Sequence, residues 1–199
     1  MESLVNLNRA VFFWINQDAG HHYAWLDWLM MFLSDAHNGA IPLVLVSVFV
    51  FWRSGKSGWV VIAGMVLLVL LSDWSGALIK HAFAAERPCD ALDGVRLLAP
   101  YCGRNSFPSN HAMNMAAIAA FIGWHYRIMI APLAILAVLV GLSRIYVGVH
   151  YPGDVLFGWI WGIAIASAFY WLGWKVIPGF RQRQRNKIED TTRLEEDNN

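Results

Sequence analysis

Residues 59–79 read WVVIAGMVLLVLLSDWSGALI, and only one residue in this stretch, Asp73, carries a charge. A helix needs about 20 mainly apolar residues to cross the hydrocarbon core of a bilayer, so the stretch predicts a transmembrane helix. Of the 199 residues in the chain, 57% are hydrophobic and 15% are charged, whereas soluble domains average about 45–50% apolar and about 25% charged residues. The composition therefore agrees with a membrane protein, and the net charge of +1 argues against a nucleic-acid partner.

Four more apolar runs can form transmembrane helices. The runs at 128–148 and 155–177 contain one basic residue each and are long enough to span the bilayer alone. Those at 40–52 and 109–124 are shorter, and they can span because neighbouring helices shelter the polar residues at their ends. The sequence therefore predicts an all-α bundle of five transmembrane helices in a core at 39–178.

The first 38 residues differ from this core. Apolar residues recur there at helical spacing among polar ones, namely Leu4, Leu7, Val11, Phe12 and Ile15. A second stretch, 23–33, is rich in Trp and Met but contains Asp27. Both stretches predict amphipathic helices that lie at the membrane interface, so 1–38 is expected to be an interfacial segment. The alternative for 23–33 is that it forms part of a sixth transmembrane helix.

Basic residues predict the orientation of the bundle, because cytoplasmic loops carry an excess of lysine and arginine. They follow the first, third and fifth predicted spans: Arg53, Lys56, Arg127, Lys175, Arg181, Arg183, Arg185 and Lys187. With alternating spans these positions share one side, which we predict to be cytoplasmic and to include a polar tail at 179–199. The segment 80–107 then faces the periplasm or exterior, although it carries four basic residues that three acids partly offset.

The two cysteines of the chain, Cys89 and Cys102, both fall in the outward segment. Two cysteines are too few for a fold built on disulfides. The outward side is oxidising, so we expect them to form a disulfide bond with each other. Two free thiols in the same loop are the alternative.

Polar residues gather where the predicted spans end on the outward side. Asp154 is the one acid between Asp93 and Glu189, and His150 lies four residues before it, one helical turn away in a helix. The same ends of the spans carry three cations, a hydroxyl and a second histidine: Lys80, Arg87, Arg144, Ser109 and His111. Three cations without matching acids indicate an anionic ligand, and the arginine fork matches the oxygens of phosphate.

These residue types suit phosphoryl transfer. A histidine can attack phosphorus when a carboxylate orients its ring, which fits His150 with Asp154. His111 can protonate the leaving oxygen, and backbone N–H groups at the start of the helix near Ser109 can bind phosphate. No cluster of His, Cys and carboxylate residues shows metal-ligand spacing in the sequence, so we expect neither a metal nor another cofactor.

The order and spacing of these residues resemble the three-part signature of the type 2 phosphatidic acid phosphatase superfamily. The parts are Lys80-x6-Arg87-Pro88, Pro108-Ser109-Asn110-His111 and Ser143-Arg144-x5-His150-x3-Asp154. The resemblance covers residues 80–154 directly, and the helix layout extends it to about 38–177. Three motifs in this order are much more specific than any one of them alone.

The resemblance implies a role for each of these residues. Five of them would hold the phosphate: Lys80, Arg87, Ser109, Asn110 through its backbone, and Arg144. His111 would be the acid, His150 the nucleophile and Asp154 its orienting partner, in a reaction that uses no metal and passes through a phosphohistidine. One position departs from the pattern, since the family usually has glycine where this chain has Asn110. Asparagine is among the non-glycine residues that best tolerate the left-handed backbone region.

The resemblance also implies an activity and a location. We expect a multi-pass protein of the inner (plasma) membrane that hydrolyses a lipid phosphate or diphosphate from the periplasmic or exterior face. The short chain and the outward site favour undecaprenyl diphosphate; phosphatidylglycerol phosphate, phosphatidic acid and the phosphates of lipid A are alternatives. Two other classes are a vanadate-dependent haloperoxidase, which the apolar spans argue against, and a non-catalytic lipid transporter, which the intact nucleophile–acid pair argues against.

Overall fold

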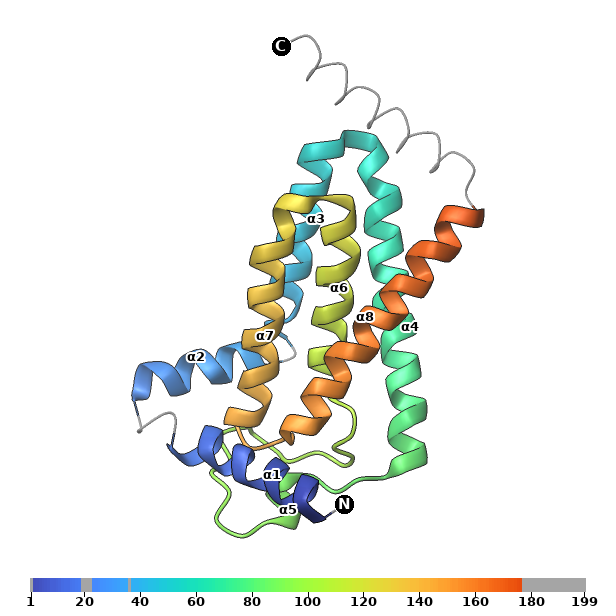
Figure 1. The fold of residues 1–199 in the computed structure, drawn as a ribbon. Helices are drawn as coiled ribbons and strands as arrows, with labels where there is room; N and C mark the ends of the chain where they lie inside the picture. Colours follow the sequence, from blue (N-terminus) through green and yellow to red (C-terminus); the bar gives the residue numbers. More distant parts are fainter. Residues whose placement is uncertain (1, 19–22, 36, 177–199) are drawn as a thin grey trace, which may run out of the picture.

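The computed structural model describes residues 2–18, 23–35 and 37–176, and every regular element in these ranges is a helix (Figure 1). The predicted all-α class is confirmed. Five helices coincide with the five predicted apolar runs: α3 (Ala40–Ser54), α4 (Gly58–Phe83), α6 (Asn110–His125), α7 (Ile130–Tyr146) and α8 (Pro152–Val176). The predicted tail at 179–199 lies outside the described residues.

Three stretches of the described chain are long and apolar enough to cross a membrane. They are Ala40–Ala91, which contains α3 and α4, then Arg127–Tyr146 and Pro152–Gly173. Large apolar side chains are exposed along these stretches, among them Leu67, Leu70, Ile135 and Ile160. Exposed apolar surface of this extent is expected where lipid replaces water as the solvent. Helix α6 lies inside the bundle, behind the helices that carry this surface.

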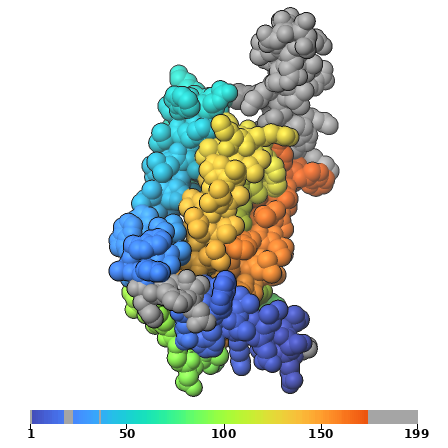
Figure 2. All heavy atoms as spheres, turned by 60° about the vertical axis from the view of Figure 1, so that its left-hand side comes forward, coloured from blue at the N-terminus to red at the C-terminus, as the bar shows by residue number. Residues whose placement is uncertain are grey.

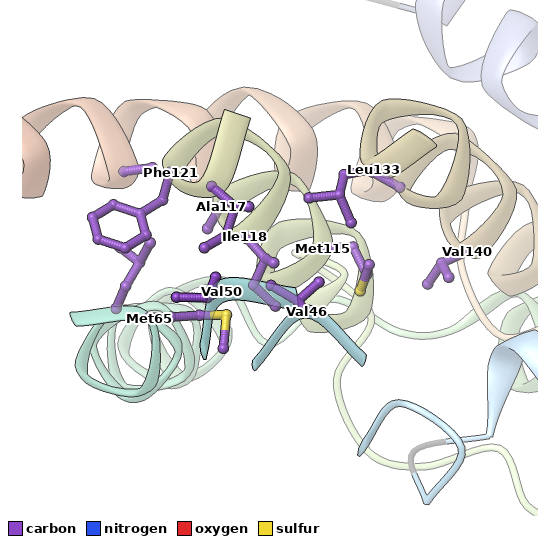
Figure 3. Packing of buried hydrophobic residues seen from close by; sticks show 13 residues of the cluster. Val46, Val50, Met65, Met115, Ala117, Ile118, Phe121, Leu133 and Val140 are labelled. Carbon is purple, nitrogen blue, oxygen red and sulfur yellow. The ribbon is translucent and has the colours of Figure 1, made fainter. Parts of the chain in front are cut away.

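Helix α6 forms the centre of the bundle and contacts α4, α7 and α8. Its buried side chains join a core to which α3, α4 and α7 also contribute; Figure 3 labels Val46, Val50, Met65, Met115, Ala117, Ile118, Phe121, Leu133 and Val140. Two glycines of α8 allow the closest approach. A Cβ at Gly162 would lie 2.2 Å from the carbonyl oxygen of Met113, and one at Gly158 would lie 2.8 Å from that of Ser109. The stretch of α8 around Gly158 and Gly162 thereby lies directly against the first turn of α6.

The N-terminal segment forms two separate helices, as predicted. Helix α1 (Glu2–Phe13) continues into a π-helical turn (Trp14–Asp18), and α2 (Ala24–Ser34) follows. In Figure 1 both helices lie across one end of the bundle and do not run along its long helices. With 11 residues, α2 is roughly 16 Å long at 1.5 Å per residue, and it is too short to cross a hydrocarbon core of about 30 Å by itself.

The segment between α4 and α6 covers the same end of the bundle. It contains one short helix, α5 (Pro88–Ala91), and the predicted disulfide bond between Cys89 and Cys102 is present, with a Cα–Cα distance of 6.0 Å. Arg96 forms a salt bridge with Asp27 of α2, and its guanidinium carbon lies 5.7 Å from the centre of the Tyr146 ring. The disulfide bond therefore joins two parts of the segment to each other, and Arg96 connects the segment to α2 and α7.

Replacement of both cysteines by serine is expected to lower the melting temperature of the purified protein. The bond joins residues 13 positions apart, and closure of a loop of that size is worth roughly 3 kcal/mol in the chain-entropy model. Thermal unfolding in detergent, with and without reductant, measures the effect. Reductant should lower the melting temperature of the wild type and leave that of the double variant unchanged. An unchanged wild-type value, with reduction verified by mass spectrometry, would contradict the prediction.

Candidate active site

All eight residues predicted for the site lie at the end of the bundle that α1, α2 and the α4–α6 segment cover. Three parts of the chain supply them. These are the end of α4 with the segment after it, the start of α6, and the end of α7 with the turn into α8. The hydrophobic packing of α6 against α4, α7 and α8 brings these parts together. One hydrogen bond joins two of them directly, since the backbone N–H of Ser109 donates to the carbonyl oxygen of Asp154 at 3.2 Å.

His150 and Asp154 form a buried pair, with exposed fractions of 2% and 5%. Nδ1 of the imidazole lies 3.3 Å from Oδ2 of Asp154. The same carboxylate oxygen accepts the Ser106 hydroxyl proton and, at 2.9 Å, the backbone N–H of Tyr151. Pro152 begins α8, so Asp154 lies in the first helical turn, where the helix dipole favours a carboxylate. A carboxylate fixed in this way favours the tautomer with the proton on Nδ1 and leaves Nε2 free to attack.

Arg87 lies on the other side of the imidazole. Its Nη1 donates to the carbonyl oxygen of Val149 at 2.9 Å and lies 3.2 Å from Nε2 of His150. Burial, followed by the charges of Arg87 and Arg144, lowers the pKa of His150 well below its ordinary value. The imidazole is therefore neutral, as a nucleophile must be, and the nitrogen available for attack is next to a guanidinium that can bind phosphate oxygens.

Lys80 organises the loop that precedes α6. Its Nζ donates to the carbonyl oxygens of Asn105 and Ser106, both at 3.2 Å, and to that of Pro108 at 2.5 Å. An ammonium group has three protons, so these contacts use its full donor capacity. In this structure, Lys80 thus shapes the Pro108-Ser109 turn.

Arg144 contacts the end of α2. Its Nη1 donates to the carbonyl oxygen of Ser34 at 2.6 Å and also to the Ser34 hydroxyl. His111, in the first turn of α6, lies within electrostatic range of Arg144, Arg87 and Lys80. The structure therefore gathers the two histidines and the three cations as predicted, while α2 contributes a contact that the sequence did not indicate.

Several buried polar atoms at this site have no hydrogen-bond partner among the described residues. They are Nε of Arg87, Nε of Arg144, Oγ of Ser109 and Oδ1 of Asn110. Buried polar atoms are rarely left unsatisfied in folded proteins, so each needs an explanation. The first three can donate a hydrogen bond and belong to residues predicted to hold phosphate through their side chains, so an anion bound between them would satisfy them. Oδ1 of Asn110 is an acceptor, which an anion would not satisfy.

Among the described residues, one group of His, Cys, Asp or Glu side chains is compact enough to hold a metal ion, and it lies in the α4–α6 segment. It consists of Cys89, Asp90 and Cys102. Both sulfur atoms belong to the disulfide bond and are not thiolate ligands.

Sequence reasoning missed two residues of the site. Ser106 donates to Asp154, and Ser34 accepts from Arg144. Ser106 is 48 positions from Asp154, and Ser34 is 110 positions from Arg144. Neither serine belongs to the three motifs. Ser106 could have been suspected from its place three residues before Ser109, but no pattern in the sequence connects Ser34 with the site.

A buried histidine–carboxylate pair surrounded by cations, at the end of a bundle of apolar helices, fits a membrane-bound phosphatase. The model of the PAP2 superfamily matches residues 58–178. The chain belongs to this superfamily. It is therefore a multi-pass membrane protein and a hydrolase that acts on lipid phosphates.

Individual relatives cover most of the chain. It is 33% identical over 150 residues to undecaprenyl-diphosphatase BcrC of Bacillus subtilis, which covers 75% of this chain and 76% of that protein. It is 32% identical over 167 residues to an undecaprenyl-diphosphatase of Sulfolobus acidocaldarius (81% and 76%). It is also 30% identical over 178 residues to the lipid A 4'-phosphatase of Porphyromonas gingivalis (85% and 74%). The crystal structure of Aquifex aeolicus LpxE superimposes with a TM-score of 0.67 and 26% identity, covering 82% of this chain and 94% of that one.

Proposed function

We propose that this enzyme hydrolyses undecaprenyl diphosphate to undecaprenyl phosphate and inorganic phosphate through a phosphohistidine. The observation that carries the mechanism is the position of His150, with Nδ1 on Asp154 and Nε2 beside Arg87. The choice of lipid is supported by two relatives of this chain, both named undecaprenyl-diphosphatases. A relative at 30% identity is a lipid A phosphatase, so the phosphates of lipid A are the main alternative substrate.

The proposed reaction has two steps. In the first, Nε2 of His150 attacks the terminal phosphorus, and the bond from phosphorus to the bridging oxygen breaks. His111 gives a proton to that oxygen as the lipid monophosphate leaves. In the second step, water attacks the phosphohistidine, His111 takes a proton from the water, and inorganic phosphate is released. Asp154 stabilises the positive charge that develops on the His150 ring in the first step.

Charge stabilisation is assigned to the residues around this pair. The developing charge on the phosphoryl oxygens would be bound by Arg87, Arg144, Lys80, Ser109 and the backbone N–H of Asn110. All three cations bond to carbonyl oxygens in this structure, Lys80 to the loop before α6, Arg87 to Val149 and Arg144 to Ser34. We infer that the phosphate takes over part of these contacts when it binds.

We place the bundle in the inner (plasma) membrane with the active site facing the periplasm or exterior. Arg53 and Arg127 lie at the end of the bundle remote from the site, which supports a cytoplasmic position for that end. Five helices would span (α3, α4, α6, α7 and α8), and α1 and α2 would lie in the outer interface. Figure 2 shows that α1 and the α4–α6 segment form one end of the molecule and the α3–α4 connection the other. Residues 1–38, 39–178 and 179–199 would thus be interfacial segment, catalytic core and cytoplasmic tail.

A panel of lipid phosphates tests the proposed substrate. Purified protein is assayed for phosphate release from undecaprenyl diphosphate, phosphatidylglycerol phosphate, phosphatidic acid and lipid A. The kcat/KM for undecaprenyl diphosphate should exceed the others by about tenfold or more, which corresponds to about 1.4 kcal/mol of transition-state binding. A higher value for lipid A would replace the proposed substrate while leaving the mechanism intact.

Activity is expected to persist in chelator and to be inhibited by vanadate. Lys80, Arg87 and Arg144 supply three positive charges at the site, so no metal is required to neutralise the phosphoryl oxygens. Vanadate adopts the five-coordinate geometry of phosphoryl transfer and should compete with substrate. Phosphate release is measured after treatment with EDTA and across a vanadate titration. Loss of activity in EDTA that magnesium or zinc restores would contradict the prediction.

A further inference from the structure

Asp73 is an acid within an apolar helix, and the proposed reaction does not use it. It lies in α4, seven residues before Lys80, and is therefore about 10 Å further into the bundle at 1.5 Å per residue. Its Oδ1 accepts a hydrogen bond from Nδ2 of Asn114 at 2.9 Å and another from Nδ2 of Asn110 at 3.2 Å. Ionisable residues inside membrane helices are costly and rare, which makes them candidates for a function.

The two asparagines belong to the first turns of α6. Asn110 is its first residue, and Asn114 lies one turn further on the same face. The helices approach closely at Gly76, where a Cβ would lie 2.8 Å from Oδ1 of Asn110 and 2.5 Å from Cε of Met113. A glycine at 76 therefore lets α4 approach near enough for Asp73 to bond both amides. One carboxylate on α4 thus connects to the first and fifth residues of α6.

The same turn of α6 carries the proposed phosphate-binding groups. The first backbone N–H groups of a helix have no intrahelical acceptor and can bind an anion. On one side this turn is fixed to α8, through the bond from Ser109 N–H to the Asp154 carbonyl oxygen. On the other side it is fixed to α4 through Asp73. The turn is therefore held between two helices, and Asp73 provides the second attachment.

We propose that Asp73 is a positioning residue for phosphate binding: it fixes the first turn of α6 and thereby the backbone N–H of Asn110 and the imidazole of His111. This inference rests on the proposed function, because it assigns those two groups to the phosphate. It also gives a reason for Asn110, which stands where the resemblance predicts glycine. Glycine has no side chain that could bond Asp73, whereas asparagine adds one attachment to the turn.

Asp73→Leu and Asn114→Leu test the proposal from its two sides. Leucine suits a membrane helix better than aspartate does, so Asp73→Leu should insert and fold. The amide oxygen of Asp73→Asn can still accept both bonds, so this variant should stay within about twofold of the wild type. Ser75→Ala is the matched control, because the hydroxyl of Ser75 bonds to Trp161 of α8 and to the Ser72 carbonyl within α4 rather than to α6.

The readouts separate positioning from stability. Inhibition by vanadate and kcat/KM on an aryl phosphate report the phosphate site, and hydrogen exchange of the peptide containing residues 106–114 reports the first turn of α6. Asp73→Leu should weaken vanadate binding and lower kcat/KM by about 3- to 20-fold, the range that hydrogen bonds between membrane helices support. Its exchange should be faster and its melting temperature unchanged. Asn114→Leu should change vanadate binding, kcat/KM and exchange in the same direction. The double variant should lose no more activity than Asp73→Leu alone.

The proposal would be overturned if Asp73→Leu had the same vanadate inhibition, the same kcat/KM and the same hydrogen exchange as the wild type. If Asp73→Leu does not fold, Asn114→Leu provides the same comparison with the carboxylate intact. Wild-type protein that releases no phosphate from any substrate would refute the proposed function, and exchange in residues 106–114 would still decide whether Asp73 fixes the turn.

Discussion

His150→Ala is expected to abolish hydrolysis of every phosphate substrate, with kcat/KM reduced by roughly 10⁴-fold or more. The reason is geometric. His150 has its Nδ1 on Asp154 and its Nε2 beside Arg87, and no other histidine in the described chain is paired with a buried carboxylate. Loss of the nucleophile removes the covalent step, so a change of leaving group cannot restore the rate.

Two measurements check this result. Phosphate release is compared between the wild type and His150→Ala on a lipid phosphate and on p-nitrophenyl phosphate, with folding verified by thermal unfolding. The acid-labile phosphohistidine is trapped by rapid quenching with labelled substrate. The label should be present in the wild type and absent in His150→Ala. Labelled His150→Ala, or substantial activity on either substrate, would show that another residue attacks phosphorus.

Asp154→Asn is the companion variant. The amide would still fit the site and accept the Ser106 proton, but it would no longer hold the imidazole with a negative charge. In a catalytic triad, the corresponding change costs about 10⁴-fold through loss of the correct tautomer. We expect a loss of similar size here, because Oδ2 of Asp154 also accepts the Tyr151 N–H and cannot turn away easily.

The helices were predictable because each depends on a property of its own stretch of chain. The run 59–79 carries no charge except at Asp73, and α4 extends it only to Gly58–Phe83. The run 109–124 is less apolar, yet α6 forms there and is the most buried helix, since α4, α7 and α8 surround it. Composition could not have revealed that central position, which depends on small residues such as Gly158 and Gly162 in another helix.

That the candidate residues cluster at one end of the bundle was predictable from their type and spacing, whereas their present contacts were not. The sequence predicts that Lys80 and Arg144 hold phosphate, and in the structure each bonds to carbonyl oxygens from distant segments. Arg144 bonds Ser34, which lies 110 positions away, in a helix that the sequence indicated only as amphipathic. Contacts of this kind depend on how α2 packs against α7, and hydrophobic periodicity within α2 contains no information about its partner.

His111→Ala is expected to lose activity in proportion to the basicity of the leaving group. In the proposed reaction His111 only protonates the departing oxygen, and it belongs to α6, whereas His150 belongs to the α7–α8 turn. An alkoxide leaving group, as in a lipid monophosphate such as phosphatidic acid, needs that proton, so the loss on such a substrate should be about 10²–10⁴-fold, the usual contribution of a general acid. An aryl oxide such as p-nitrophenolate is already a weak base and can leave without it. The loss on p-nitrophenyl phosphate should therefore be much smaller.

The comparison needs kcat/KM for His111→Ala and His150→Ala on both substrates, with matched melting temperatures. His111→Asn serves as a control, because it retains a polar side chain in the first turn of α6 but cannot act as an acid near neutral pH. It should behave like His111→Ala if the proton is what matters, and like the wild type if only a hydrogen bond is needed. If His111→Ala is inactive on the aryl phosphate while His150→Ala retains activity there, the roles of the two histidines are reversed, because removal of a general acid cannot abolish a reaction whose leaving group departs without a proton.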